Sequence, residues 1–133
     1  VEKIQDRILS HDIKLWNINN ATLSIAAIKL NEKKGIFYDF NKFNNSTEMY
    51  TALSHEFYHC ELDAFYNFAS SLQTRKRREY KANKQLVLDL IPIEKFKKLL
   101  QSDFSKWEIA EEFGVTEDTI DLAFKIYKNI GDL

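Results

Sequence analysis

The chain has 133 residues, 44% of them hydrophobic and 14% aromatic, which excludes a disordered protein and is enough for one domain with a buried core. Its 19 basic and 20 acidic residues exclude a general electrostatic attraction to nucleic acid or to an anionic membrane. A single cysteine excludes an internal disulfide, and no stretch approaches the roughly 18 apolar residues of a membrane span. We therefore expect a cytoplasmic protein.

The first third of the chain predicts a short helix followed by a small sheet. Apolar residues, Leu9 among them, recur at helical spacing over residues 2–10, so we expect a helix with these residues facing inward. Alternating and β-branched patterns then predict three strands, at residues 13–18, 21–30 and 36–40. Between the last two, the polar segment 31–35 ends in Gly35, which can adopt positive φ, and predicts a hairpin loop. The expected sheet is an antiparallel meander.

The central motif lies at residues 55–59, His-Glu-Phe-Tyr-His. On a helix, side chains at i and i+4 share one face, so both imidazoles can bind one ion while Glu56 reaches a water on that ion. Asn45 is a suitable N-cap, and no Gly or Pro interrupts residues 46–71. The motif is typical of zinc-dependent hydrolases, and the alternative is a surface helix that happens to carry two histidines.

A catalytic zinc normally has three protein ligands, so a third residue is needed. Cys60 lies about 100° around the helix from the second histidine and is expected to be a small buried hydrophobic residue. Glu61 and Asp63 also fall outside the i, i+4 phase. The third ligand should come from another helix. Glu79 is a candidate because Ala82 would let its helix approach closely, but spacing favours it only slightly over a surface glutamate.

Helices dominate the rest of the chain. The basic run at residues 75–78 predicts a solvated helix start, and the alternative is steering of an acidic segment of a partner. Helices are expected at residues 77–90 and 93–100, separated by Pro92.

The last part of the chain, residues 106–127, has a helix-turn-helix pattern. Ser105 and Glu108 form a capping box, Gly114 ends the first helix, and Thr116 caps the second. The residues expected to line the contact between the two helices are Trp107, Ile109, Phe113, Ile120, Ala123, Phe124 and Tyr127. The second helix starts with Glu117, Asp118, Thr119 and Asp121. Three of these four residues are acidic and would repel phosphate, so we expect no DNA binding.

Several segments resemble the ImmA/IrrE family of metallopeptidases. Residues 79–83, Glu-Tyr-Lys-Ala-Asn, and 90–92, Leu-Ile-Pro, resemble the E-x-x-A-N…L-x-P segment that follows the HExxH helix in that family. Residues 109–115, Ile-Ala-Glu-Glu-Phe-Gly-Val, are similar to its C-terminal part, and residues 65–67 resemble its phage-borne members, which are found beside repressor genes. The chain departs from the family at Phe57-Tyr58, where Leu-Gly is usual.

The resemblance implies a zinc ion held by His55, His59 and Glu79, with Glu56 as the general base. It further implies a cytoplasmic, site-specific endopeptidase whose partner and substrate is a helix-turn-helix repressor of a phage or mobile element, with no direct contact with nucleic acid or membrane. The alternative is a non-proteolytic regulator or a toxin–antitoxin-type module that binds a repressor or DNA and in which the metal is structural. Four residues remain candidates for the group that stabilises the oxyanion: Tyr58, Tyr66, Tyr80 and His11.

The expected fold class is α+β, with a small three-stranded antiparallel sheet, a zincin-like HExxH helix and a mostly helical C-terminal part. We expect one domain over residues 1–133. Its parts are the N-terminal helix and sheet in 1–44, the zinc-site helices in 45–100, and the helix-turn-helix-like pair in 103–133.

Overall fold

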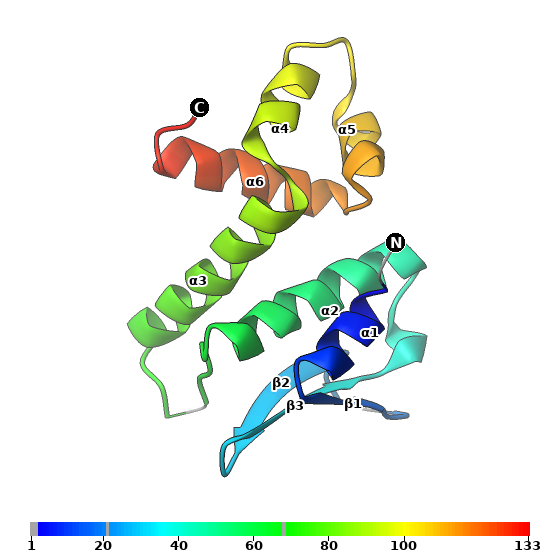
Figure 1. Ribbon diagram of the computed structural model, residues 1–133, viewed down its shortest axis with the longest axis vertical. Coiled ribbons are helices and arrows are strands. Elements are labelled where there is room, and N and C mark those ends of the chain that lie inside the picture. The colour runs from blue at the N-terminus through cyan, green and yellow to red at the C-terminus, as the bar shows by residue number, and fades with distance from the viewer. Residues whose placement is uncertain (1–2, 21, 68) are drawn as a thin grey trace. The chain divides into compact units, whose positions relative to one another are not determined.

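The computed structural model describes residues 3–20, 22–67 and 69–133 (Figure 1). The fold class is α+β, as expected, with a three-stranded mixed sheet and six α-helices among these residues. None of those helices is both long enough and apolar enough to cross a membrane. The chain divides into two compact units, residues 1–82 and 83–133, and each is described by itself. The single domain expected over residues 1–133 stays a prediction.

Unit 1 contains the sheet and the histidine motif. Its elements are α1 (Ile4–Ser10), β1 (Ile13–Asn17), β2 (Ile25–Leu30), β3 (Lys33–Tyr38), a 3-10 turn (Phe40–Lys42), α2 (Ser46–Glu61) and the first part of α3 (Leu72–Leu90). Helix α1 buries Ile4 and Ile8, but Leu9, which was expected to face inward, is exposed. Residue 2 of the expected helix and Ala21 of the expected second strand lie outside the described residues.

The sheet has the strand order β1-β3-β2, so the expected antiparallel meander is wrong. Strands β2 and β3 form an antiparallel hairpin in which Ile25 lies opposite Tyr38. Strand β1 pairs with the other edge of β3, and this pairing is parallel, with Ile13 opposite Lys34. Alternation in a sequence shows which face of a strand is buried, but not which strand is its neighbour. Strand β2 is therefore an edge strand.

The hairpin turn also differs from the expected loop. Asn31 (φ 49°) and Glu32 (φ 68°) make the turn, whereas Gly35 lies inside β3 and is buried. A Cβ atom on Gly35 would lie 2.6 Å from the Trp16 ring, which stacks on Phe37 with ring centroids 4.6 Å apart. The glycine is thus needed to make room for the indole and not to provide positive φ.

Helices α1 and α2 lie on the same side of the sheet (Figure 1). The core between these layers consists of buried apolar side chains from all of them: Ile8, Ile13, Ile36, Leu53, Phe57 and Cys60. Burying an Ile, Leu or Phe side chain contributes roughly 1.5–3 kcal/mol. This core fixes α2 against β2 and β3, and so holds the motif helix at the edge of the sheet.

Helix α3 begins at Leu72, five residues before its expected start at residue 77. The Oγ atom of Ser71 accepts a hydrogen bond of 3.1 Å from the backbone N–H of Thr74, which is how a serine caps a helix. The basic run at residues 75–78 is therefore inside the helix and does not open it.

Unit 2 consists of the end of α3, α4 (Ile93–Leu100), α5 (Lys106–Phe113) and α6 (Glu117–Asn129). The capping box of Ser105 and Glu108 is present, and Gly114 ends α5 with φ 67°, both as predicted. Two details of the predicted contact are wrong, because Trp107 and Phe124 are exposed. On α6, the buried residues are Thr119, Ile120, Ala123, Ile126 and Tyr127.

Candidate metal centre

Helix α2 supplies both histidines of the motif. The Oδ1 atom of Asn45 accepts a hydrogen bond of 2.8 Å from the N–H of Glu48, which confirms the predicted N-cap. The helix then continues without a break to Glu61, so His55 and His59 lie one turn apart. Their ring centroids are 4.6 Å apart.

Helix α3 brings Glu79 to the two histidines. Its Oε2 atom lies 2.9 Å from Nε2 of His55, and its Oε1 atom lies 2.9 Å from Nε2 of His59. The two Nε2 atoms are 3.0 Å apart. These three residues, which the sequence analysis proposed as ligands, therefore form a group that could hold a metal ion, with ligand atoms within 4.8 Å of one another.

The donor set fits a zinc ion. Tetrahedral zinc with Zn–N and Zn–O distances of about 2.1 Å separates its ligand atoms by about 3.4 Å, so the observed distances need to widen only slightly. No arrangement of protons satisfies every contact at once, because a proton on both Nε2 atoms would set two N–H groups against each other at 3.0 Å. A cation between the lone pairs of His55, His59 and Glu79 satisfies all three residues.

The chain reversal after α2 orients His59. The Nδ1 atom of His59 lies 2.7 Å from the backbone carbonyl of Ala64, and only the nitrogen can donate in this contact. In the neutral ring the proton is thereby assigned to Nδ1, which leaves the lone pair of Nε2 directed towards His55 and Glu79. Hydrogen bonds of this kind to the second ring nitrogen are typical of histidines that bind metals.

Electrostatics in the group favour an ion pair in the absence of metal. Burial disfavours the charge on Glu79, but its contacts with His55 and His59 outweigh burial and hold its pKa well below the usual range. Burial likewise disfavours the charged imidazole of His59, yet the contacts with Glu79 and with the Ala64 carbonyl raise its pKa. A cation at this position therefore has a carboxylate ready to bind it, and below the raised pKa of His59 the cation must displace a proton from that ring.

Glu56 lies beside the group, in a cleft of about 420 Å³. Burial raises the pKa of its carboxyl, and Glu79 adds to the effect, while the two histidines and a hydrogen bond from the Ala27 backbone oppose it. Ala27 belongs to the edge strand β2, so the sheet helps to hold the carboxylate. Residues of β2 also form one wall of the cleft, together with Leu23; they are Ile25, Ala26, Ala27 and Ile28.

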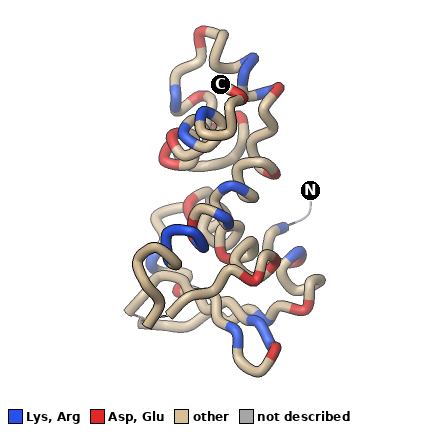
Figure 2. Tube along the Cα trace, turned by 90° about the vertical axis from the view of Figure 1, so that its left-hand side faces the viewer, with Lys and Arg blue, Asp and Glu red and all other residues tan. Residues whose placement is uncertain are grey.

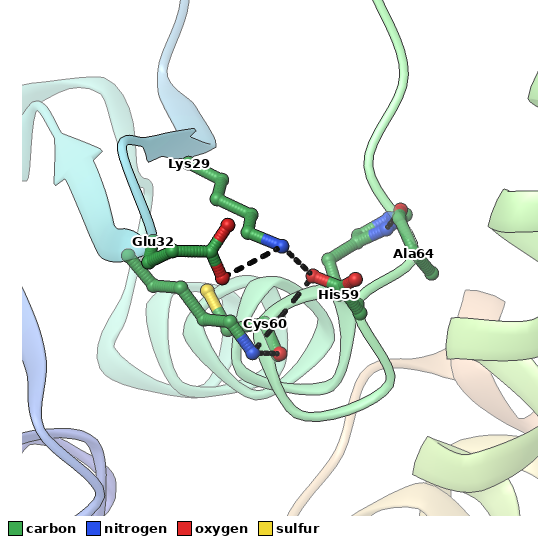
Figure 3. A network of polar contacts seen from close by, with 7 residues as sticks. Lys29, Glu32, His59, Cys60 and Ala64 are labelled. Atoms are coloured by element: carbon green, nitrogen blue, oxygen red, sulfur yellow. Dashed lines mark hydrogen bonds and ion pairs between the residues drawn. The ribbon is translucent and has the colours of Figure 1, made fainter.

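The other candidates near the motif lie outside the group, as expected. Cys60 is fully buried, and burial raises the pKa of its thiol to about 12. Glu61 pairs with His11 at 3.0 Å. Asp63 pairs with Lys29 at 2.9 Å, and Figure 3 shows Lys29 reaching from β2 towards the C-terminal end of α2.

A second lysine strengthens this connection between the hairpin and α2. The Nζ atom of Lys34 donates to the backbone carbonyl of Cys60 over 2.6 Å, in the last turn of α2, where a cation interacts favourably with the helix dipole (Figure 3). Lys29 also approaches Glu32 at 3.7 Å. These contacts tie the β2–β3 hairpin to the end of the motif helix, next to the segment that holds His59.

Two residues of the cleft were not assigned to the site by the sequence analysis. Tyr66 was only one of four candidates for an oxyanion donor, and its hydroxyl donates to Oε1 of Glu79 over 2.9 Å. Arg75, expected to be solvated, is half-buried, and it lines the cleft with its guanidinium carbon 6.0 Å from the centre of the Tyr66 ring. Arg75 could have been placed near the site from the sequence, because it lies four residues before Glu79 and therefore on the same face of α3.

Comparison of this chain with protein-family models, with curated proteins and with solved structures found no match. Functional inference therefore depends on the arrangement of the side chains.

Proposed function

We propose that this chain is a zinc-dependent endopeptidase. The observation that carries the proposal is the convergence of His55, His59 and Glu79. Two of these residues, His59 and Glu79, line the same cleft as the carboxylate of Glu56. Two imidazoles and a carboxylate are a common ligand set of hydrolytic zinc sites, which keep one coordination position for water or substrate.

Each residue has a chemical task in this proposal. His55, His59 and Glu79 would hold the zinc, and Glu56 would act as the general base. When bound, zinc supplies Lewis-acid chemistry, which lowers the pKa of a water to about 7 and polarises a peptide carbonyl. Glu56 accepts the proton that the attacking water loses and returns it to the leaving amine, so Glu56 is again deprotonated at the end of one turnover.

The cleft suits an extended peptide. Strand β2 is at the edge of the sheet and lines the cleft beside Glu56 and His59. An extended segment that hydrogen-bonds to an edge strand becomes an additional strand of the sheet. A substrate bound along β2 would therefore pass the reacting groups with its backbone extended, which requires a flexible or locally unfolded segment in the target protein.

We further propose that the target is a helix-turn-helix repressor in the cytoplasm, as the resemblance to the ImmA/IrrE family implies. Contact with DNA is not expected, because α6 begins with Glu117 and Asp118, which would repel phosphate. Apart from the basic run at residues 75–78, basic and acidic residues are both scattered along the trace of each unit, which fits a protein partner better than a nucleic acid (Figure 2).

The test compares the parent with Glu56→Gln, which keeps the shape of the side chain but cannot accept a proton. Each protein is co-expressed with the repressor encoded beside it, and cleavage products are identified by mass spectrometry. We expect cleavage by the parent and none by Glu56→Gln, with equal zinc content. Glu61→Gln, on the same helix but paired with His11, is the matched control and should cleave normally. Full relief of repression by Glu56→Gln would instead favour a non-proteolytic regulator with a structural metal.

A further inference from the structure

Peptide hydrolysis requires a donor that stabilises the negative charge formed on the carbonyl oxygen, and four residues near the motif were candidates. Three of them are poorly placed. Tyr58 is 3% exposed and receives a hydrogen bond from Arg7 at 3.4 Å. His11 pairs with Glu61 on the outside of α2. Tyr80 is on α3 next to Glu79 but is absent from the described residues that line the cleft.

Tyr66 is differently placed, because its hydroxyl lies at the ligand group. The phenol oxygen is 2.9 Å from Oε1 of Glu79, the same oxygen atom that contacts His59. The Tyr66 ring centre lies 6.2 Å from that of His59. Tyr66 and Glu56 both line the cleft, so a peptide carbonyl that enters it has the general base and a neutral hydrogen-bond donor within reach.

The surroundings of Tyr66 allow the hydroxyl to change its acceptor. The side chain comes from the segment between α2 and α3, and the residue is 43% exposed, so its ring can turn without disturbing the core. Arg75 lies against the ring and favours its position over the cleft, since a guanidinium is attracted to an aromatic face. Rotation of the side chain can move the hydroxyl from Glu79 to a substrate oxygen.

We propose that Tyr66 is a further catalytic residue, whose phenol O–H donates a hydrogen bond to the oxyanion of the peptide carbonyl under attack. This proposal rests on the endopeptidase function proposed above. As the water oxygen bonds to the carbonyl carbon, the π electrons of the C=O bond move onto its oxygen, and the phenol donates to that oxygen without losing its proton. Glu56 takes the proton of the water, so Tyr66 changes no charge during the step.

The experiment measures three properties of the parent, Tyr66→Phe and Tyr80→Phe. The first is zinc affinity, by competition with a chelator. The second is the binding of two zinc-directed probes to the zinc-loaded proteins. One probe is a phosphinic peptide, whose tetrahedral phosphinate imitates the oxyanion, and the other is a thiol peptide of the same side chains, which has no such oxygen. The third is kcat and KM for a repressor-derived peptide that the parent cleaves.

We expect Tyr66→Phe to lower kcat by about 10²- to 10³-fold, the usual effect of removing one oxyanion donor. KM should change little. The variant should bind the phosphinic peptide more weakly than the parent does, bind the thiol peptide equally well, and keep its zinc affinity within a few fold. Tyr80→Phe, a matched tyrosine on the outside of the site, should resemble the parent in all three measurements.

Two results would overturn the assignment of Tyr66 while leaving the peptidase intact. One is unchanged kcat and unchanged phosphinate binding. The other is a fall of about 10- to 100-fold in zinc affinity with normal turnover once zinc is saturating, because Tyr66 would then only support the ligand Glu79. If the zinc-loaded parent cleaves no peptide and prefers neither probe, the proposed endopeptidase function itself fails, and the role of Tyr66 fails with it.

Discussion

The Nε2 atom of His59 and the Oε1 atom of Glu79 lie 2.9 Å apart, and this contact joins the motif helix α2 to helix α3. His59 is buried, and Glu79 is partly exposed at the cleft. The pair therefore determines both how a cation would be held and how the metal-free protein responds to pH.

The first prediction concerns the stoichiometry of metal binding. The purified protein supplied with zinc should bind one ion per chain, because His55, His59 and Glu79 converge on one point. Glu79→Ala should weaken zinc binding by more than about 100-fold, since loss of a mere supporting group already costs about 10- to 100-fold. Elemental analysis and chelator competition measure both quantities. Asp63→Asn removes the charge paired with Lys29 and keeps a side chain that tolerates the positive φ of 51°, so it should bind zinc like the parent. Equal affinity for Glu79→Ala would exclude Glu79 as a ligand.

The second prediction concerns the stability of the metal-free protein. The raised pKa of His59 means that its contribution to stability is complete below its ordinary pKa of 6.5 and is lost as pH rises through the raised pKa. The lowered pKa of Glu79 means that its contribution is present above the ordinary value of 4.5 and is lost as pH falls through the lowered pKa. Both act together between pH 4.5 and 6.5.

Thermal unfolding in the presence of a chelator tests this window. The difference in Tm between the parent and Glu79→Gln should be largest between pH 4.5 and 6.5 and should shrink as pH rises further. Glu61→Gln serves as the control for removal of a carboxylate near the same helix. A difference that grows steadily towards alkaline pH would contradict the ion pair.

The third prediction tests the role of Gly35. Gly35→Ala should lower the free energy of unfolding by about 1–3 kcal/mol, because the added methyl group overlaps the Trp16 ring. Urea unfolding followed by far-UV circular dichroism gives this value in every background. In a Trp16→Ala background the same glycine substitution should cost much less. An equal cost in both backgrounds would mean that Gly35 is required for its backbone conformation instead.

The fourth prediction concerns unit 2. The buried hydroxyl of Tyr127 donates to the backbone carbonyl of Ile91 over 2.6 Å, just after α3 ends. Tyr127→Phe should therefore lower the free energy of unfolding by about 1–2 kcal/mol, the usual cost of leaving a buried acceptor without its donor. Tyr80→Phe, at a tyrosine that is 41% exposed, should change stability by less than about 0.5 kcal/mol. Chemical denaturation of the two variants makes the comparison.

Much of the helical structure could be predicted because its signals are local. The N-cap at Asn45, the capping box of Ser105 and Glu108, and the left-handed Gly114 each depend on residues within one or two helical turns. The spacing of His55 and His59 is local for the same reason. Glu79 was favoured only slightly by spacing, since its approach depends on how α3 packs against α2.

The errors fall where the outcome depends on distant parts of the chain. The parallel pairing of β1 with β3 was missed, because the alternation of residues within a strand does not identify the strand beside it. Gly35 resembled a turn residue because the indole of Trp16, which requires it, lies on another strand. Trp107 and Phe124 were assigned to the core by periodicity, but both are exposed. Residues at the margin of the apolar stripe of a helix can remain outside the buried contact. Tyr66 lies outside any helix or strand, where no periodic signal exists.

The positions of His55, His59 and Glu79 along the chain have a consequence for folding. The chain has one cysteine and cannot close a loop with an internal disulfide. An ion shared by α2 and α3 would instead join the two ends of the intervening segment, including the turn at Asp63 and the residues around Tyr66. In the chain-entropy account, a cross-link around a loop of about 15 residues stabilises a protein by about 3 kcal/mol by restricting its unfolded state. Zinc would then act as a reversible cross-link between α2 and α3, and a chelator could remove it without a reducing agent.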